Sequence, residues 1–145
     1  MTTLLSLDPG ETTGWSLWEY DSTYPLTHLE HGMIGHGADG FAHWYKSLPE
    51  RPDKIVCEDF ILDGRTATPN TTPLNIIGML QLDRPDLILQ RNTVKSTIPD
   101  RVLKQVGLWW PGAGHDRDSA RHALAFMRIA RHRPTINHYY PRRTV

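Results

Sequence analysis

The sequence predicts an α/β domain built on a five-stranded mixed sheet with helices on both faces. Three observations predict it: an apolar run opens the chain, short turn-rich intervals then separate two further strand patterns, and later strand patterns alternate with helical ones. Strands joined by short turns pair antiparallel, whereas a strand reached through a crossover helix lies parallel to its neighbour. A chain of 145 residues is long enough for one domain with a sizeable core.

The first three strands are expected at residues 3–8, 13–20 and 26–34. The first is a continuous apolar run and the second is rich in aromatic residues, which favour strands. Asp21, Ser22 and Pro25 supply the turn between the second and third strands. These three strands should form an antiparallel meander.

Glycines at 35, 37 and 40 then bound a helix that runs through Phe41, Trp44, Tyr45 and Leu48. The later elements are a strand at 54–59, a turn-rich loop at 61–73, a helix at 73–83, a strand at 86–90, short helices at 93–98 and 99–107, an irregular connector at 109–114, a helix at 115–132 and an extended tail. This order is typical of an RNase H-like architecture. Residues 1–133 are expected to form one such domain and residues 134–145 a C-terminal tail.

The net charge is zero, but its distribution along the chain is uneven. Residues 1–90 hold 5 Lys/Arg and 13 Asp/Glu, and residues 91–145 hold 11 Lys/Arg and 3 Asp/Glu. The basic second half favours contact with phosphates, and pairing of the two halves with each other in the fold is the alternative. The single cysteine excludes an internal disulfide, and neither a membrane span nor a signal peptide is apparent. A cytoplasmic protein without an organic cofactor is expected.

Acidic residues recur where the predicted elements would bring them together. Asp8 and Glu58 each end an apolar strand, and His115 and Asp118 lie in the first turn of a helix, three residues apart. Carboxylate oxygens are the ligands that Mg²⁺ prefers. Two Mg²⁺ ions about 4 Å apart can hydrolyse a phosphodiester. We therefore expect Asp8, Glu58, His115 and Asp118 to bind two Mg²⁺ ions, for which Mn²⁺ should substitute.

Each of these residues also has a structural interpretation. Asp8 is compatible with a turn residue that caps its own loop, and Asp-x-Gly turns also bind phosphate in actin-like ATPases, for which this chain is too short. Glu58 is compatible with a surface position at a strand end. Asp118 is compatible with a helix N-cap, a role for which Asp116 competes.

Taken together, the motifs resemble the RuvC family of Holliday-junction resolvases, most closely its short bacteriophage-borne members. The resemblance is carried by Asp8-Pro9-Gly10-x-x-x-Gly14-Trp15, by the strand that ends in Cys57-Glu58, and by His115-x-x-Asp118 followed by Ala120 and Ala123-Leu124-Ala125. It implies the strand order 3-2-1-4-5 and metal binding by Asp8, Glu58 and Asp118. His115 stands where members carry Asp or His, and Val94-Lys95 matches a pair that contacts DNA near the cleaved phosphate.

The same resemblance implies a homodimer that resolves four-way junctions in DNA recombination and repair, in the cytoplasm of a bacterial host. Paired symmetric nicks would leave 5′-phosphate and 3′-hydroxyl ends. The apolar helix at 73–83 is the expected dimer contact. The chain departs from the family in having Ser119 after the last acid, in its loop at 61–72, and in being shorter and less basic.

Several basic residues are expected to contact DNA phosphates without reading sequence. They are Arg65, Arg91, Lys95, Lys104, Arg117 and Arg121. Trp109 and Trp110 are expected to be buried or at a dimer contact, with stacking on unpaired bases as the alternative. Two other functions fit the same motifs: an RNase H-like nuclease that cuts RNA or hybrids, and a catalytically inert DNA-binding module.

Overall fold

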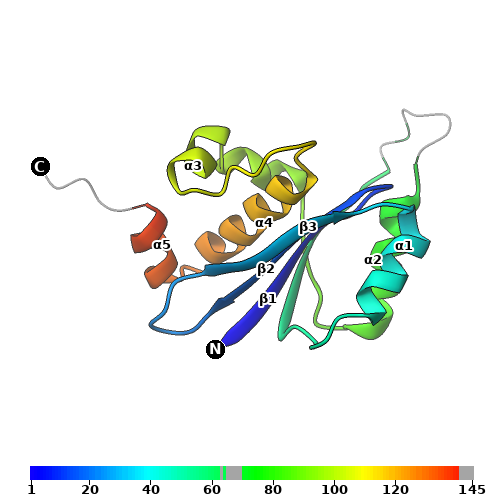
Figure 1. Ribbon diagram of the computed structural model, residues 1–145, viewed down its shortest axis with the longest axis horizontal. Helices are drawn as coiled ribbons and strands as arrows, with labels where there is room; N and C mark the ends of the chain where they lie inside the picture. Colours follow the sequence, from blue (N-terminus) through cyan, green and yellow to red (C-terminus); the bar gives the residue numbers. More distant parts are fainter. Residues whose placement is uncertain (63, 65–69, 141–145) are drawn as a thin grey trace, which may run out of the picture.

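The computed structural model describes residues 1–62, 64 and 70–140. Its centre is a five-stranded sheet in the order β3-β2-β1-β4-β5 (Figure 1). The strands are β1 (Thr2–Asp8), β2 (Thr13–Tyr20), β3 (Thr27–Ile34), β4 (Lys54–Glu58) and β5 (Ile88–Gln90). β2 pairs antiparallel with β1 and β3, whereas β4 runs parallel to β1 and to β5. The predicted mixed sheet and its strand order are confirmed.

Helices cover both faces of the sheet, as predicted. The helices are α1 (Gly37–Lys46), α2 (Thr72–Asp83), the 3₁₀ helix η1 (Asn92–Thr97), α3 (Asp100–Gln105), α4 (His115–Ile129) and α5 (Arg133–Tyr139). Figure 1 shows α1 and α2 on one side of the sheet and α3, α4 and α5 on the other. No helix in the described part of the chain is long and apolar enough to cross a membrane.

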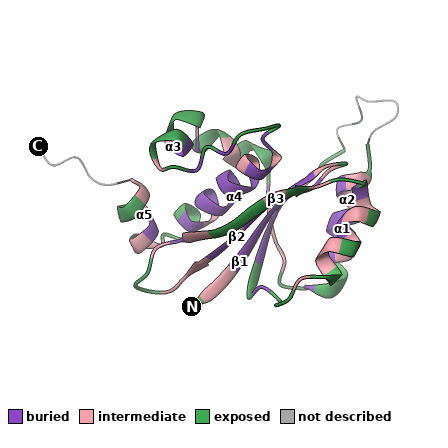
Figure 2. Ribbon diagram, viewed as in Figure 1, coloured by how far each residue is buried: buried purple, intermediate pink, exposed green. Residues whose placement is uncertain are grey.

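Side chains of the central strand alternate between two cores, one on each side of the sheet. Leu5 and Leu7 pack with residues of α1 and α2, whereas Leu4 packs with residues of α4. Figure 2 shows exposed residues on the outer sides of α1 and α2, whereas most of α4 is buried. Because the period is two residues, Asp8 lies on the same side of β1 as Leu4, the side covered by α4.

Two local predictions were wrong. Helix α1 begins at Gly37 and includes Gly40. Gly40 packs directly against the Gly35 carbonyl oxygen, because a Cβ at Gly40 would lie only 2.0 Å from that oxygen. The predicted extended tail is helical in its first part, where α5 spans residues 133–139, and residues 141–145 of that tail lie outside the described residues. Its Tyr139 hydroxyl donates to the Leu26 carbonyl at 2.7 Å, and this bond ties α5 to the start of β3.

Candidate metal centre

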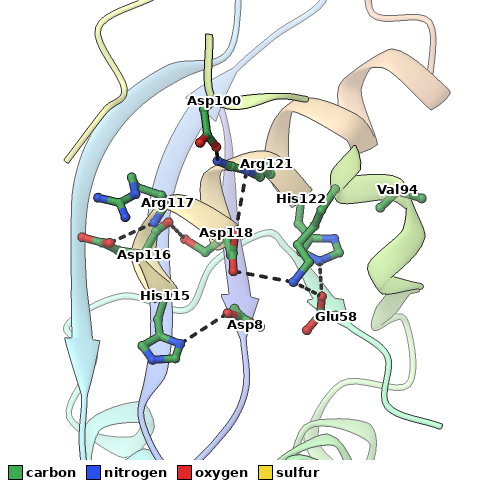
Figure 3. Close-up of polar contacts among 12 residues, drawn as sticks. Asp8, Glu58, Val94, Asp100, His115, Asp116, Arg117, Asp118, Arg121 and His122 are labelled. Atoms are coloured by element: carbon green, nitrogen blue, oxygen red, sulfur yellow. Dashed lines mark hydrogen bonds and ion pairs between the residues drawn. The ribbon is translucent and has the colours of Figure 1, made fainter. Parts of the chain in front are cut away.

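The register of the sheet brings Asp8 and Glu58 together. Leu7 of β1 pairs with Cys57 of β4 in parallel register, so the next residues along both strands are neighbours. Val56 packs in the α4 core, and Glu58, two residues later, faces the same side. Figure 3 shows the carboxyl groups of Asp8, Glu58 and Asp118 directed into one shared space.

The start of α4 brings His115 and Asp118 to the same place. His115 Nδ1 lies 3.7 Å from Asp8 Oδ2. The close approach of α4 to β2 depends on Gly14, which pairs with Asp8 across β1 and β2. A Cβ on Gly14 would lie 1.9 Å from the His115 carbonyl oxygen, so only glycine leaves room for the helix backbone at this point.

The structural interpretations of these residues are wrong. Thr13, rather than Asp8, closes the turn after β1, because its hydroxyl accepts from the Gly10 amide at 3.3 Å. The Glu58 side chain is only 15% exposed. The residue before α4 is Gly114, with φ +97° and no side-chain cap, so neither Asp116 nor Asp118 is an N-cap.

Lys95 inserts a positive charge among the carboxylates. Its Nζ lies 2.8 Å from Glu58 Oε1 and 3.6 Å from Asp118 Oδ2. Burial acts to lower the pKa of the Lys95 ammonium, but its hydrogen bond with Glu58 and the surrounding carboxylates outweigh burial and raise the pKa. Lys95 lies in the 3₁₀ helix η1, which follows β5, and its contact with DNA stays a prediction.

The pKa values of Asp8 and Glu58 are shifted in opposite directions. Burial, together with the hydrogen bond and negative charge of Glu58, raises the pKa of the Asp8 carboxyl from 3.8 to about 8. Burial also acts to raise the pKa of Glu58, but hydrogen bonds from His122, Asp8 and Lys95 outweigh it and lower this pKa to about 2. At neutral pH, Asp8 therefore holds the proton and Glu58 is a carboxylate.

A chain of buried hydroxyls seats α4 on the sheet beneath this site. Ser119 donates to the Asp116 carbonyl at 2.6 Å and lies 2.8 Å from the Ser16 hydroxyl, which accepts from the Trp18 indole at 2.8 Å. Ser6 donates to the Ser119 carbonyl at 2.6 Å. Every member of the chain has a partner, as buried polar groups require. The serine that departs from the RuvC pattern is thus part of how α4 is held.

The donors present suit a hard divalent cation. Three carboxyl groups gather with one imidazole, and the ammonium of Lys95 already lies between two of them, so the site attracts positive charge. Across residues 1–62, 64 and 70–140, no three His, Cys, Asp or Glu side chains are close enough to hold one ion in this conformation. The donor chemistry fits Mg²⁺ or Mn²⁺, and the side chains would have to move closer together to hold one ion.

The residues predicted to contact DNA have varied surroundings. Arg65 lies outside the described residues, and Arg91 and Lys104 are exposed. Arg121 forms ion pairs with Asp100 and, at 3.7 Å, with Asp118. Arg117 donates to the carbonyls of Trp110 and Gly112. The contact of all these residues with DNA stays a prediction.

The two tryptophans before α4 differ from each other. Trp110 is 9% exposed and stacks on His31, with ring centroids 3.8 Å apart. Trp109 is 36% exposed, with the Arg117 guanidinium 4.1 Å and the Lys104 ammonium 4.5 Å from its ring centroid. Trp110 is buried, as predicted, whereas Trp109 is not, and for Trp109 the alternative of a dimer contact stays a prediction.

Sequence reasoning missed two residues behind Glu58. His122, fully buried on α4, lies with Nε2 3.1 Å from Glu58 Oε1. Gln90 ends β5, directly opposite Glu58 in the register, and its amide nitrogen lies 3.1 Å from His122 Nδ1. One signal was available: Gln90 ends its strand as Asp8 and Glu58 end theirs, and His122 is four residues after Asp118, on the same side of the helix.

Comparison with known proteins identifies the fold. No family model matches the chain, and no curated protein does. Among solved structures, T. thermophilus RuvC in complex with a Holliday junction substrate is similar, with a TM-score of 0.66 and 14% identity over 92% of this chain and 98% of that one. A second Thermus thermophilus RuvC structure has a TM-score of 0.63 and 15% identity over 90% of this chain and 96% of that one. At such identities the likeness concerns architecture: the chain has the RuvC-type, RNase H-like fold.

Proposed function

We propose that this chain is a metal-dependent endonuclease that resolves branched DNA, in particular four-way junctions. One observation carries the proposal: Asp8, Glu58 and Asp118 converge with His115 and Lys95 at one end of the sheet of a RuvC-type fold. The solved structure of similar fold is bound to a Holliday junction, and this supports a branched DNA substrate.

Asp8, Glu58, Asp118 and His115 are the residues that would hold Mg²⁺. When bound, Mg²⁺ supplies neutralisation of the phosphate charge and an activated water. The Asp8 carboxyl has to release its proton before it can serve as a ligand, because a ligating carboxylate is ionised. Lys95, held between Glu58 and Asp118, can donate to a phosphate oxygen beside the carboxylates.

Paired symmetric nicks require two copies of the site, so the proposal includes a homodimer formed through α2. Buried Ile76, Ile77 and Leu80 attach α2 to the core, whereas Leu82 is 89% exposed. Gly78, one turn before Leu82, is also exposed, and nothing lies within 4 Å of where its Cβ would be. An exposed leucine beside a glycine favours close contact with a second helix.

The test is the digestion of a mobile four-way junction with Mg²⁺, scored on sequencing gels for paired nicks that leave 5′-phosphate ends. Asp8→Asn should reduce the cleavage rate by more than about a hundredfold, since it replaces a direct ligand, while junction binding changes little. Asp39→Asn, an exposed acid in α1, is the matched control and should cut normally.

Equal cleavage by Asp8→Asn and wild type would refute the proposal. An RNA–DNA hybrid and a structured RNA are digested alongside, and faster cutting of either would assign the chain to RNA processing. Binding of the junction without any cutting, in Mg²⁺ or in Mn²⁺, would make it a DNA-binding module.

A further inference from the structure

A buried polar pair lies directly behind Glu58. His122 of α4 and Gln90 at the end of β5 are both buried. One ring nitrogen of His122 contacts Glu58 Oε1 at 3.1 Å, and the other contacts the Gln90 amide nitrogen at 3.1 Å. Figure 3 shows the His122 ring directed at the Glu58 carboxylate. The three side chains form one continuous line from β5 to the candidate metal centre.

The orientation of the Gln90 amide follows from a second contact. Gln90 Nε2 lies 3.0 Å from the backbone carbonyl of His122. A carbonyl oxygen only accepts hydrogen bonds, so the amide end that faces it must be the NH₂ group. That NH₂ group has two hydrogens and therefore also donates to His122 Nδ1.

The same contacts fix the tautomer of His122. Since Nδ1 accepts from Gln90, it carries no hydrogen, and in a neutral imidazole the hydrogen then sits on Nε2. Nε2–H points at Glu58 Oε1 and donates to it. Oε1 also receives the Lys95 ammonium at 2.8 Å, so two donors from separate elements hold the same carboxylate oxygen.

We propose that His122, set in its Nε2–H tautomer by Gln90, is a positioning residue that fixes the Glu58 carboxylate for cation binding. The proposal deepens the proposed function and rests on Glu58 being a metal ligand. Groups that hydrogen-bond to a metal ligand typically change metal affinity by about 10- to 100-fold when removed. His122 lies four residues after Asp118, so the helix that supplies one ligand also orients another.

The tautomer is tested on the metal-free wild-type chain, without any substitution. Nitrogen-15 NMR of histidine-labelled protein reports which ring nitrogen carries hydrogen, and loss of a signal in a His122 variant assigns the residue. We expect a protonated Nε2 and a bare Nδ1 for His122. A hydrogen on Nδ1, alone or together with Nε2–H, would overturn the proposal, because Gln90 would then not set the tautomer.

Positioning is tested with two amide substitutions of opposite design. His122→Gln can place an NH₂ group near the position of Nε2 and keep the donor to Glu58, whereas His122→Asn reaches only as far as Nδ1 and loses it. Mn²⁺ binding is measured by calorimetry on the metal-free proteins. His122→Asn should weaken Mn²⁺ binding by about tenfold or more, and His122→Gln should restore most of the affinity.

Thermal unfolding of both variants in EDTA separates positioning from loss of structure. The proposal fails if Mn²⁺ affinity follows the melting temperature across the variants, if His122→Asn binds Mn²⁺ as wild type does, or if the wild type binds no Mn²⁺. Junction cleavage is scored separately. A wild type that binds Mn²⁺ with the expected variant pattern but cuts no DNA would contradict the proposed function and still support the positioning role.

Discussion

Asp8 and Glu58 show how one residue's environment decides its chemistry. Both are acids at the ends of adjacent strands. Burial is the main cause of the raised pKa of Asp8, whereas hydrogen bonds from His122, Asp8 and Lys95 lower the pKa of Glu58. In the metal-free protein, Asp8 therefore keeps a proton up to a pH of about 8. This has a consequence for stability that can be measured without DNA.

The metal-free protein should lose stability as pH rises through the range from about 5 to about 8. The folded state holds the Asp8 proton with a pKa of about 8, and the unfolded chain releases it near 3.8. Between these values the folded state binds more protons, so the free energy of unfolding falls with pH. The opposite contribution of Glu58, whose pKa is lowered to about 2, is complete above its ordinary value of 4.5.

Urea unfolding in EDTA at several pH values measures this effect. Asp8→Asn cannot ionise and should show a shallower loss of stability over the same range, with the difference between the two proteins isolating Asp8 from other titrating groups. Parallel pH profiles for wild type and Asp8→Asn would contradict the assignment of the proton to Asp8.

The sequence predicts individual site residues where a strong local pattern carries them. Asp8 and Glu58 end apolar strands, and His115 and Asp118 begin a long helix, so their convergence follows from the fold class alone. His122 was not foreseen, because a histidine among alanines and leucine on a helix is compatible with any buried position. Its role depends on the pairing of Glu58 with Gln90, which strand register decides and composition does not.

At the scale of elements, the site depends on how closely α4 approaches β1 and β2. Gly14 opens the gap for the helix backbone, and the hydroxyl chain from Ser6, Ser16 and Ser119 fixes the helix at that depth. The close contact at Gly14 and the hydroxyl chain both position the start of α4, which carries His115 and Asp118. A change that lifts this turn should therefore affect stability and metal binding together.

Gly14→Ala should destabilise the fold by roughly 1–3 kcal/mol, the usual cost of overpacking, and weaken Mn²⁺ binding. The added methyl group would lie 1.9 Å from the His115 carbonyl oxygen, in backbone that cannot rotate away. Thermal unfolding and calorimetric Mn²⁺ titration measure the two effects. Gly35→Ala is the control, because its Cβ would meet nothing within 4 Å. If the two substitutions behave alike, the close approach at Gly14 does not position α4.

Helix α5 shows where element prediction fails. Pro134 was interpreted as the start of an extended tail, but proline is also favoured in the first turn of a helix, and here it occupies that place. Contacts far along the chain then hold the helix: the Leu26 amide donates to the Thr135 hydroxyl at 2.9 Å. Seven residues form too short a helix to be stable alone, so tertiary contacts decide the outcome.

At the scale of the whole molecule, the two faces of the sheet differ in what covers them and in where the candidate metal centre lies. α4 and the elements beside it complete the candidate metal centre, whereas α1 and α2 cover the opposite face (Figure 1). Leu82 is the most exposed of the large apolar side chains in the described residues, and it lies on α2. A dimer through α2 would keep both metal centres free for DNA, since they open on the other side of the sheet.

Leu82→Glu should convert the proposed dimer to a monomer that keeps its fold and its Mn²⁺ binding. A charge on an exposed position costs the monomer little, but it cannot be buried against a second helix. Light scattering after size-exclusion chromatography gives the mass, and a four-way junction assay gives the cutting pattern. Single, uncoordinated nicks should replace paired ones, because each monomer carries one site. Ile129→Glu, an exposed apolar residue of α4, is the matched control and should leave the mass unchanged. A dimeric Leu82→Glu protein that still makes paired nicks would place the dimer contact elsewhere.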